Sequence, residues 1–102
     1  MTTSPAPGTV RVVLPGMLRD LTGGVGDVAA PVAAGGADLA TVLDHALQQW
    51  PRVDARIRDE RGQIRQHVNV FVDGEDAKRG QGLATVVRPG ATIHVLNAVS
   101  GG

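Results

Sequence analysis

The residues best suited to chemistry lie at the end of the sequence, which closes on Gly101 and Gly102. A chain-terminal carboxyl group is fully ionised at neutral pH. Its oxygens can attack the α-phosphorus of ATP and form an acyl adenylate, from which AMP departs readily. Neither glycine has a Cβ atom, so this backbone fits a narrow channel that a side chain would block. We therefore predict Gly102 as the reacting residue, with Val99, Ser100 and Gly101 as residues that a partner recognises.

Other side chains that could take part in a reaction are scattered along the sequence. The sequence has no cysteine, which excludes a thiolate nucleophile, thiolate metal ligands and disulfides. His45, His67 and His94 are far apart and fall in helix or strand patterns, so we predict no metal site. Glu75 and Asp76 form a carboxylate pair that could serve in acid–base catalysis. Their position just after a turn signal favours a solvated turn, with Asp76 capping local backbone.

Composition bounds the class of protein. A chain of 102 residues supports one domain, and with 42% hydrophobic but only 2% aromatic residues its core must be aliphatic. Ten basic and ten acidic residues cancel, which argues against a nucleic-acid partner. Residues 1–8 lack the features of a secretory signal and are expected to form a flexible arm. No apolar run approaches the ~20 residues of a membrane span, so we expect no membrane partner and a cytoplasmic protein.

One amphipathic helix is predicted after residue 38. Asp38 can accept hydrogen bonds from the free N–H groups of the first helical turn. Pro51 disfavours the α conformation at Trp50, and we expect the helix to end there. Between them, apolar residues recur at helical spacing and form one stripe: Leu39, Val42, Leu43, Ala46, Leu47 and Trp50.

The segment that follows, residues 52–66, is polar and rich in arginine. Val53 and Ile57 are its predicted anchors to the core. Acidic residues interleave with the basic ones, which favours a solvated loop; a docking patch for an acidic partner is the alternative. The basic residues are Arg52, Arg56, Arg58, Arg61 and Arg65.

Strands are predicted on both sides of the helix. The first two would form an antiparallel hairpin, joined through a helical turn at residues 17–21 and a glycine reversal. The first and last strands could pair in parallel in the middle of a sheet, through the crossover that carries the helix. One helix on one mixed sheet makes an α+β domain of β-grasp arrangement over residues 9–97. The predicted strands cover residues 10–14, 25–32, 67–72, 85–87 (a short edge strand) and 92–96.

Five stretches of the sequence carry a family resemblance: residues 67–76 (HVNVFVDGED), 82–85 (GLAT) and 89–102 (PGATIHVLNAVSGG), with 14–19 (LPGMLR) and 22–24 (TGG) nearer the front. Together they resemble the ubiquitin-like sulfur carriers, and the resemblance spans residues 10–102. These carriers include the molybdopterin synthase small subunit, the thiazole-synthesis carrier and the actinobacterial cysteine-synthesis carrier, of which the last looks most similar. Asn97 and Ser100, however, replace the proline and alanine that tend to occur in cysteine-synthesis carriers.

This resemblance implies a β-grasp fold, with four to five strands packed on one main helix and a flexible tail at residues 98–102. It implies a protein cosubstrate that binds no cofactor and is not itself an enzyme. An adenylating enzyme of the ubiquitin-activating type would use ATP to adenylate Gly102. Sulfide or a persulfide would then displace AMP and leave a thiocarboxylate, whose sulfur passes to an acceptor enzyme.

The sequence leaves the acceptor open. Cysteine biosynthesis on a cysteine-synthase-like pyridoxal-phosphate enzyme, with a metal-dependent peptidase as a further candidate partner, is the first expectation. Alternatives are sulfur transfer to molybdopterin precursor, to thiamine thiazole or to a thio-containing secondary metabolite, a ubiquitin-like modifier joined to lysines, and a plain interaction module. The molybdopterin alternative, with a larger catalytic subunit as partner, predicts an apolar face around Val10, Val12 and the last strand.

Overall fold

The computed structural model describes residues 8–97; residues 1–7 and the predicted tail, 98–102, lie outside the described residues. In the described part, no helix is long and apolar enough to cross a membrane. The helices are α1 (Gly16–Arg19), α2 (Leu39–Leu47) and α3 (Pro51–Ile57), with 3-10 turns at Asp20–Thr22 and Gly82–Ala84. The strands are β1 (Thr9–Val13), β2 (Asp27–Pro31), β3 (Ala37–Asp38), β4 (Val68–Val72), β5 (Glu75–Asp76), β6 (Val86–Val87) and β7 (Thr92–Asn97).

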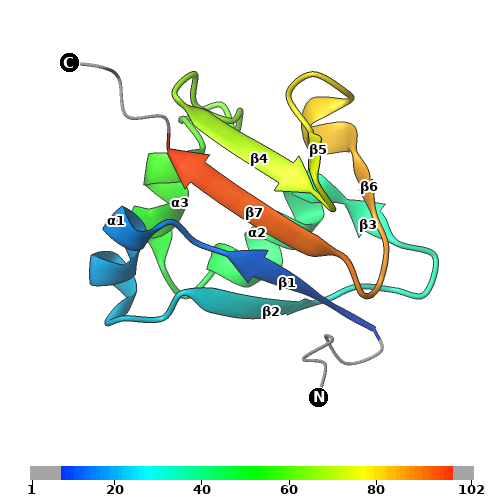
Figure 1. The fold of residues 1–102 in the computed structure, drawn as a ribbon, viewed down its shortest axis with the longest axis horizontal. Helices are drawn as coiled ribbons and strands as arrows, with labels where there is room; N and C mark the ends of the chain where they lie inside the picture. Colours follow the sequence, from blue (N-terminus) through cyan, green and yellow to red (C-terminus); the bar gives the residue numbers. More distant parts are fainter. Residues whose placement is uncertain (1–7, 98–102) are drawn as a thin grey trace.

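The main sheet has five strands in the order β2-β1-β7-β4-β5, and α2 lies behind it in Figure 1. β1 and β2 form the predicted antiparallel hairpin, and β4 runs antiparallel to β7. β1 and β7 run parallel in the middle of the sheet, with Arg11 opposite Thr92. The predicted mixed sheet and its central parallel pair are confirmed. β7 therefore has a hydrogen-bonded neighbour on each side.

Alternation along the strands directs one set of side chains into an aliphatic core. Val68 and Val70 of β4 are both fully buried, as is Ile93 of β7. Val10 and Val12 of β1 are fully buried in the same cluster. Under the molybdopterin alternative an apolar face was expected around Val10, Val12 and the last strand. Its part at Val10 and Val12 is wrong, because these side chains fill the core, whereas Leu96 of β7 is 48% exposed.

Helix α2 begins where it was predicted to begin. Oδ1 of Asp38 accepts a hydrogen bond from the Thr41 N–H at 2.9 Å, and the hydrogen bonding with Thr41 lowers the pKa of the Asp38 carboxyl. The apolar stripe lies in the common core of the helix and the sheet, as its spacing indicated. Its buried members are Leu39, Val42, Leu43, Ala46 and Leu47.

The predicted end of this helix is wrong. α2 ends at Leu47, and Pro51 begins a second helix, α3, which is anchored in the core by the predicted residues Val53 and Ile57. Trp50 does avoid the α conformation, with φ −130° and ψ 74°, as the following proline requires. Proline suits the first position of a helix because the N–H that it lacks would have no intrahelical partner there. The same proline is therefore both a stop and a start signal.

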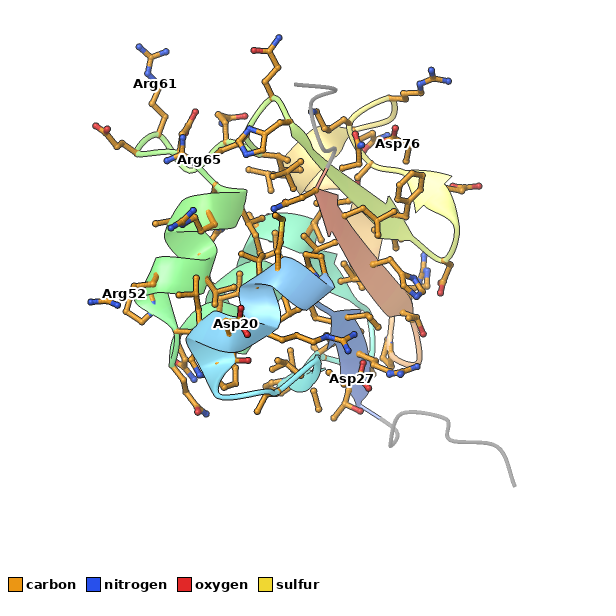
Figure 2. All side chains as sticks on the ribbon, turned by 60° about the vertical axis from the view of Figure 1, so that its left-hand side comes forward. Asp20, Asp27, Arg52, Arg61, Arg65 and Asp76 are labelled. Carbon is orange, nitrogen blue, oxygen red and sulfur yellow. The ribbon has the colours of Figure 1, made fainter. Side chains whose placement is uncertain are left out.

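The expected solvated loop over residues 52–66 is also wrong for its first half, which is helix α3 and the residue that follows it. Arg52 and Arg61 are exposed and point away from the body of the protein (Figure 2). Arg58 is different, because it is only 8% exposed. A buried cation needs a partner of opposite charge, and two carboxylates provide it.

Arg58 connects the end of α3 to α2. Its Nε and Nη2 donate to the two carboxylate oxygens of Asp54 at 2.7 and 2.8 Å, and Nη2 lies 2.8 Å from Oδ1 of Asp44 on α2. The hydrogen bond to Asp54 is the main cause that raises the pKa of Arg58, with a smaller contribution from Asp44 and an opposing one from burial. This two-point contact of a planar guanidinium with a carboxylate is a strong, directional pairing.

We predict that Asp54→Ala lowers the free energy of unfolding by about 2 kcal/mol, because it leaves a buried guanidinium poorly paired. Losing one partner of a fully buried pair costs about 3–5 kcal/mol, but the Asp54 side chain is 33% exposed, which reduces the loss. Asp44→Ala is the matched control and should cost under about 0.5 kcal/mol, since that side chain is 66% exposed. Urea unfolding followed by Trp50 fluorescence measures both, and equal losses would contradict Asp54 as the main partner.

Candidate functional site

The predicted reacting residue, Gly102, and the predicted recognition residues Val99, Ser100 and Gly101 lie outside the described residues. The structure does describe the strand from which they continue. That strand is β7, which ends at Asn97 in the centre of the main sheet. The described part of the candidate site is therefore the surface around the end of β7, called here the tail base.

β7 extends past its parallel neighbour. It pairs with β1 only from Thr92 to His94, but with β4 as far as Asn97, which lies opposite Val68. The last residues of β7 therefore have α1 beside them in place of β1, and Figure 1 shows α1 next to the arrowhead of β7. Nδ2 of Asn97 donates a hydrogen bond to the sulfur of Met17 at 2.8 Å. This contact ties α1 to the end of the strand.

A shallow pocket of 270 Å³ lies at the tail base, between α1, the end of α3 and the end of β7. Met17 is 58% exposed at this pocket. Oδ1 of Asn97 is buried and has no hydrogen-bond partner in the part of the chain that the structure describes. An exposed apolar side chain at the edge of a pocket is suited to contact with another protein, whereas the buried Oδ1 of Asn97 is not accessible to one. The lining residues are Met17, Leu18, Asp20, Leu21, Arg56, His67 and Asn97.

The outer face of the sheet continues this surface along β7. Ile93 and Val95 point into the core, so His94 and Leu96 point outward, and Leu96 is 48% exposed. His94 lies on a strand, as its sequence pattern indicated, and is exposed. A large exposed apolar side chain beside the tail base adds to the area that a partner can cover.

The other candidate residues do not converge. His45, His67 and His94 are exposed and lie on α2, before β4 and on β7, and residues 8–97 contain no group of three potential metal ligands. Glu75 and Asp76 form the short strand β5, which the turn prediction missed. Asp76 caps local backbone as predicted, since its Oδ1 accepts from the Lys78 N–H at 2.9 Å.

The contact between Met17 and Asn97 was not predicted. The helical turn near residue 17 and the end of the last strand near residue 97 were each expected, but 80 residues separate them. No periodicity in the sequence indicates such a contact, because it depends on which strand is the neighbour of β7. The placement of α1 follows only from the parallel pairing of β1 with β7.

Comparison with known proteins identifies a family and a similar sulfur carrier. The model of the ThiS family matches residues 12–102. The chain is 33% identical over 95 residues to the sulfur carrier protein CysO of Mycobacterium tuberculosis (strain ATCC 25618 / H37Rv), which covers 91% of this chain and 98% of that protein.

Solved structures agree with this match. A chain in the crystal structure of the Amycolatopsis orientalis BexX/CysO complex has a TM-score of 0.75 and 33% identity, over 91% of this chain and 99% of that one. SAMP1 from Haloferax volcanii has a TM-score of 0.78 and 26% identity, over 93% and 100%. The chain therefore belongs to the ThiS family, and its β-grasp fold is that of the ubiquitin-like sulfur carriers.

Proposed function

We propose that the chain is a sulfur carrier that acts through the terminal carboxylate of Gly102. A carboxylate oxygen attacks the α-phosphorus of ATP, so that an O–P bond forms and pyrophosphate leaves. Hydrosulfide then attacks the acyl carbon, a C–S bond forms, and AMP leaves with the electron pair of the broken C–O bond. The product is a thiocarboxylate. A persulfide serves equally where a thiol reduces the acyl disulfide that it first forms.

The observation that carries this proposal is the family match, which runs through to Gly102. The identity to CysO supports it further, since it extends over 98% of that carrier and is not confined to a short motif. The geometry of β7 is compatible with the role. A strand with pairing partners on both sides gives a rigid origin for residues that must enter another protein.

The chain acts in this proposal as a protein cosubstrate, and its partners supply the catalysis. An adenylating enzyme of the ubiquitin-activating type binds and consumes ATP. Gly102 enters its channel first, followed by Gly101, Ser100 and Val99. The tail base, with exposed Met17, is the surface that such an enzyme would cover. The crystal structure of the BexX/CysO complex supports assembly of a carrier of this kind with a second protein.

Cysteine biosynthesis is the destination that the identity to CysO favours. The acceptor would be a cysteine-synthase-like enzyme that holds an activated serine on its pyridoxal phosphate, and a metal-dependent peptidase would release the product. We place these steps in the cytoplasm. A stable complex with the large subunit of molybdopterin synthase is less favoured, because Val10 and Val12 are in the core and offer no apolar face.

A protein modifier is the second candidate function. The specific observation in its favour is the likeness to SAMP1, which a second structure names as a small archaeal modifier protein. In this role the acyl group of Gly102 would pass to lysine amines of other proteins and form isopeptide bonds. The first, activating step is the same in both functions, so the product distinguishes them.

Intact-mass spectrometry of the protein purified from its own cell tests the proposal. We expect a fraction that is heavier by the difference between one sulfur and one oxygen atom. Iodoacetamide should alkylate this fraction once, and because the chain has no cysteine the label must map to the terminal peptide. A protein that stays an unmodified carboxylate with its activating enzyme, ATP and sulfide contradicts the carrier function, whereas isopeptide adducts support the modifier.

A further inference from the structure

The sequence contains a single lysine, Lys78, and three backbone carbonyls hold its ammonium group. Nζ donates to the carbonyl oxygens of Gln66 at 2.8 Å, Val68 at 3.0 Å and Arg65 at 3.3 Å. An ammonium group has three N–H donors, so these bonds use its full donor capacity. The residue as a whole is exposed, but its nitrogen is engaged on every N–H.

Lys78 covers the edge of β4 where the strand ladder stops. β5 pairs with β4 only at Phe71 and Val72, and the Ala77 N–H continues the pairing to the Val70 carbonyl at 2.8 Å. Nζ of Lys78 then takes the next free carbonyl of the edge, that of Val68. Charged side chains at open strand edges also prevent pairing with other chains, which is a sufficient structural reason for a lysine here.

The same position lies close to the tail base. Val68 is opposite Asn97 in the register of β4 and β7, and neighbouring strands are about 4.8 Å apart. Five residues of extended chain span up to about 17 Å. Residues 98–102 are therefore long enough for an activated acyl carbon at Gly102 to reach Nζ of Lys78, and a self-reaction is within range.

We propose that the three carbonyls withhold Lys78 from the activated terminus, so that the acyl group remains available for sulfur. This inference rests on the proposed function. In self-capture, the lone pair of a neutral Nζ would attack the acyl carbon of Gly102. A C–N bond would form, the C–O bond to AMP would break with AMP keeping the electron pair, and the excess proton on nitrogen would pass to water.

The observed geometry opposes this reaction. Every N–H direction of Nζ ends on a carbonyl oxygen, so loss of a proton in place would point the new lone pair at the lone pairs of that oxygen. Nζ must leave its three acceptors before it can attack. The same restraint applies when the activated terminus belongs to a second copy, so the chain does not form polymers of itself through Lys78.

A swap of neighbouring residues tests the restraint. The double variant Lys78→Arg, Arg79→Lys has the composition of the native chain and moves its lysine to an exposed position. With limiting N-hydroxysuccinimidyl acetate, we expect Lys78 to be acetylated about tenfold more slowly than the relocated lysine, because bonds from a charged donor must break first. In urea the two rates should coincide. Equal rates in the folded proteins would overturn the proposal.

A chemically prepared thioester at Gly102 tests the consequence. At mildly alkaline pH the native thioester should hydrolyse to the carboxylate, whereas the swapped protein should lose the thiol without gaining water and yield an amide at the relocated lysine. As much amide in the native protein, or none in either, would show that the restraint does not protect the terminus.

Thermal unfolding checks that both proteins are folded at the assay temperature, and the single variant Arg79→Lys replaces the swap if the swap is unfolded. The assay contains no ATP, sulfide or activating enzyme. A failed carrier assay therefore counts against the proposed function and leaves this result unaffected.

Discussion

Deletion of Gly102 is expected to reduce thiocarboxylate formation at least about a hundredfold, because misplacement of a reacting group by even 1 Å can cost that much. Removing one residue withdraws the carboxylate by about 3.5 Å along an extended backbone. Gly101 would then have to reach the position that Gly102 occupies at the end of the enzyme's channel, which the shortened terminus does not reach. Formation of the acyl adenylate, followed by pyrophosphate release or intact mass, measures the loss.

Two variants control for length and for composition. One extra glycine after Gly102 moves the carboxylate outward by one residue and should cause a comparable loss. Ser100→Ala keeps the length and removes only a hydroxyl group, so Gly102 keeps its place in the chain and the activity should stay within about twofold. The thermal midpoint of the Gly102 deletion should equal that of the native protein; a large drop would mean that the terminus contributes to the core.

Leu43→Ala should lower the free energy of unfolding by about 3 kcal/mol, through lost burial and the cavity left behind. Leu43 is fully buried in the stripe of α2 that packs into the common core. His45→Ala, two residues along the same helix and exposed, is the matched control and should change stability by less than about 0.5 kcal/mol. Urea unfolding with an unchanged slope gives both values.

These two predictions separate the fold from the chemistry. The deletion at Gly102 should abolish activation and spare stability, whereas Leu43→Ala should reduce stability while the folded fraction is still activated at the native rate. A slower activation of folded Leu43→Ala protein would contradict this separation, and would mean that the partner reads the helix layer as well as the residues near the terminus.

Elements with a strong local signal were predicted well. Asp38 and the apolar stripe located α2, and the strands expected at residues 10–14, 67–72 and 92–96 agree with β1, β4 and β7. The two-residue strands β3 and β6 have too few positions for a period to be visible. Residues 85–87 were expected as an edge strand, but β6 pairs with β3 in a separate two-stranded sheet. Gly36 permits this pairing, since a Cβ there would lie 2.9 Å from the Val87 carbonyl oxygen.

The second helix and its buried cation show why the middle of the chain was harder to predict. Alternating charges between residues 52 and 66 resemble a solvated loop as closely as they resemble a helix surface. Arg58 differs from Arg52 and Arg61 only in what lies opposite it, and that depends on how α3 packs on α2. The charged residues of the ion pair can be identified in the sequence, but the burial of Arg58 cannot be predicted from it.

The candidate site divides in the same way. The terminal glycines and the family resemblance indicated the chemistry that we propose, because the proposed reacting group is defined by its position in the chain. The tail base and the engaged nitrogen of Lys78 were not predicted, since both depend on strand neighbours that are distant in sequence. Only the pairing of the strands in the folded protein brings the residues of each contact together.

The parallel pairing of β1 with β7 also governs when the protein can mature. Arg11 of β1 can pair with Thr92 of β7 only after the residues between them have been synthesised. The main sheet therefore cannot form until its central strand is available. Such long-range contacts slow folding. As β7 leaves the ribosome, the sheet closes around it. The strand that leads to Gly102 is thus the one that completes the domain, and an unfinished copy would lack the tail base that the proposed activating enzyme is expected to cover.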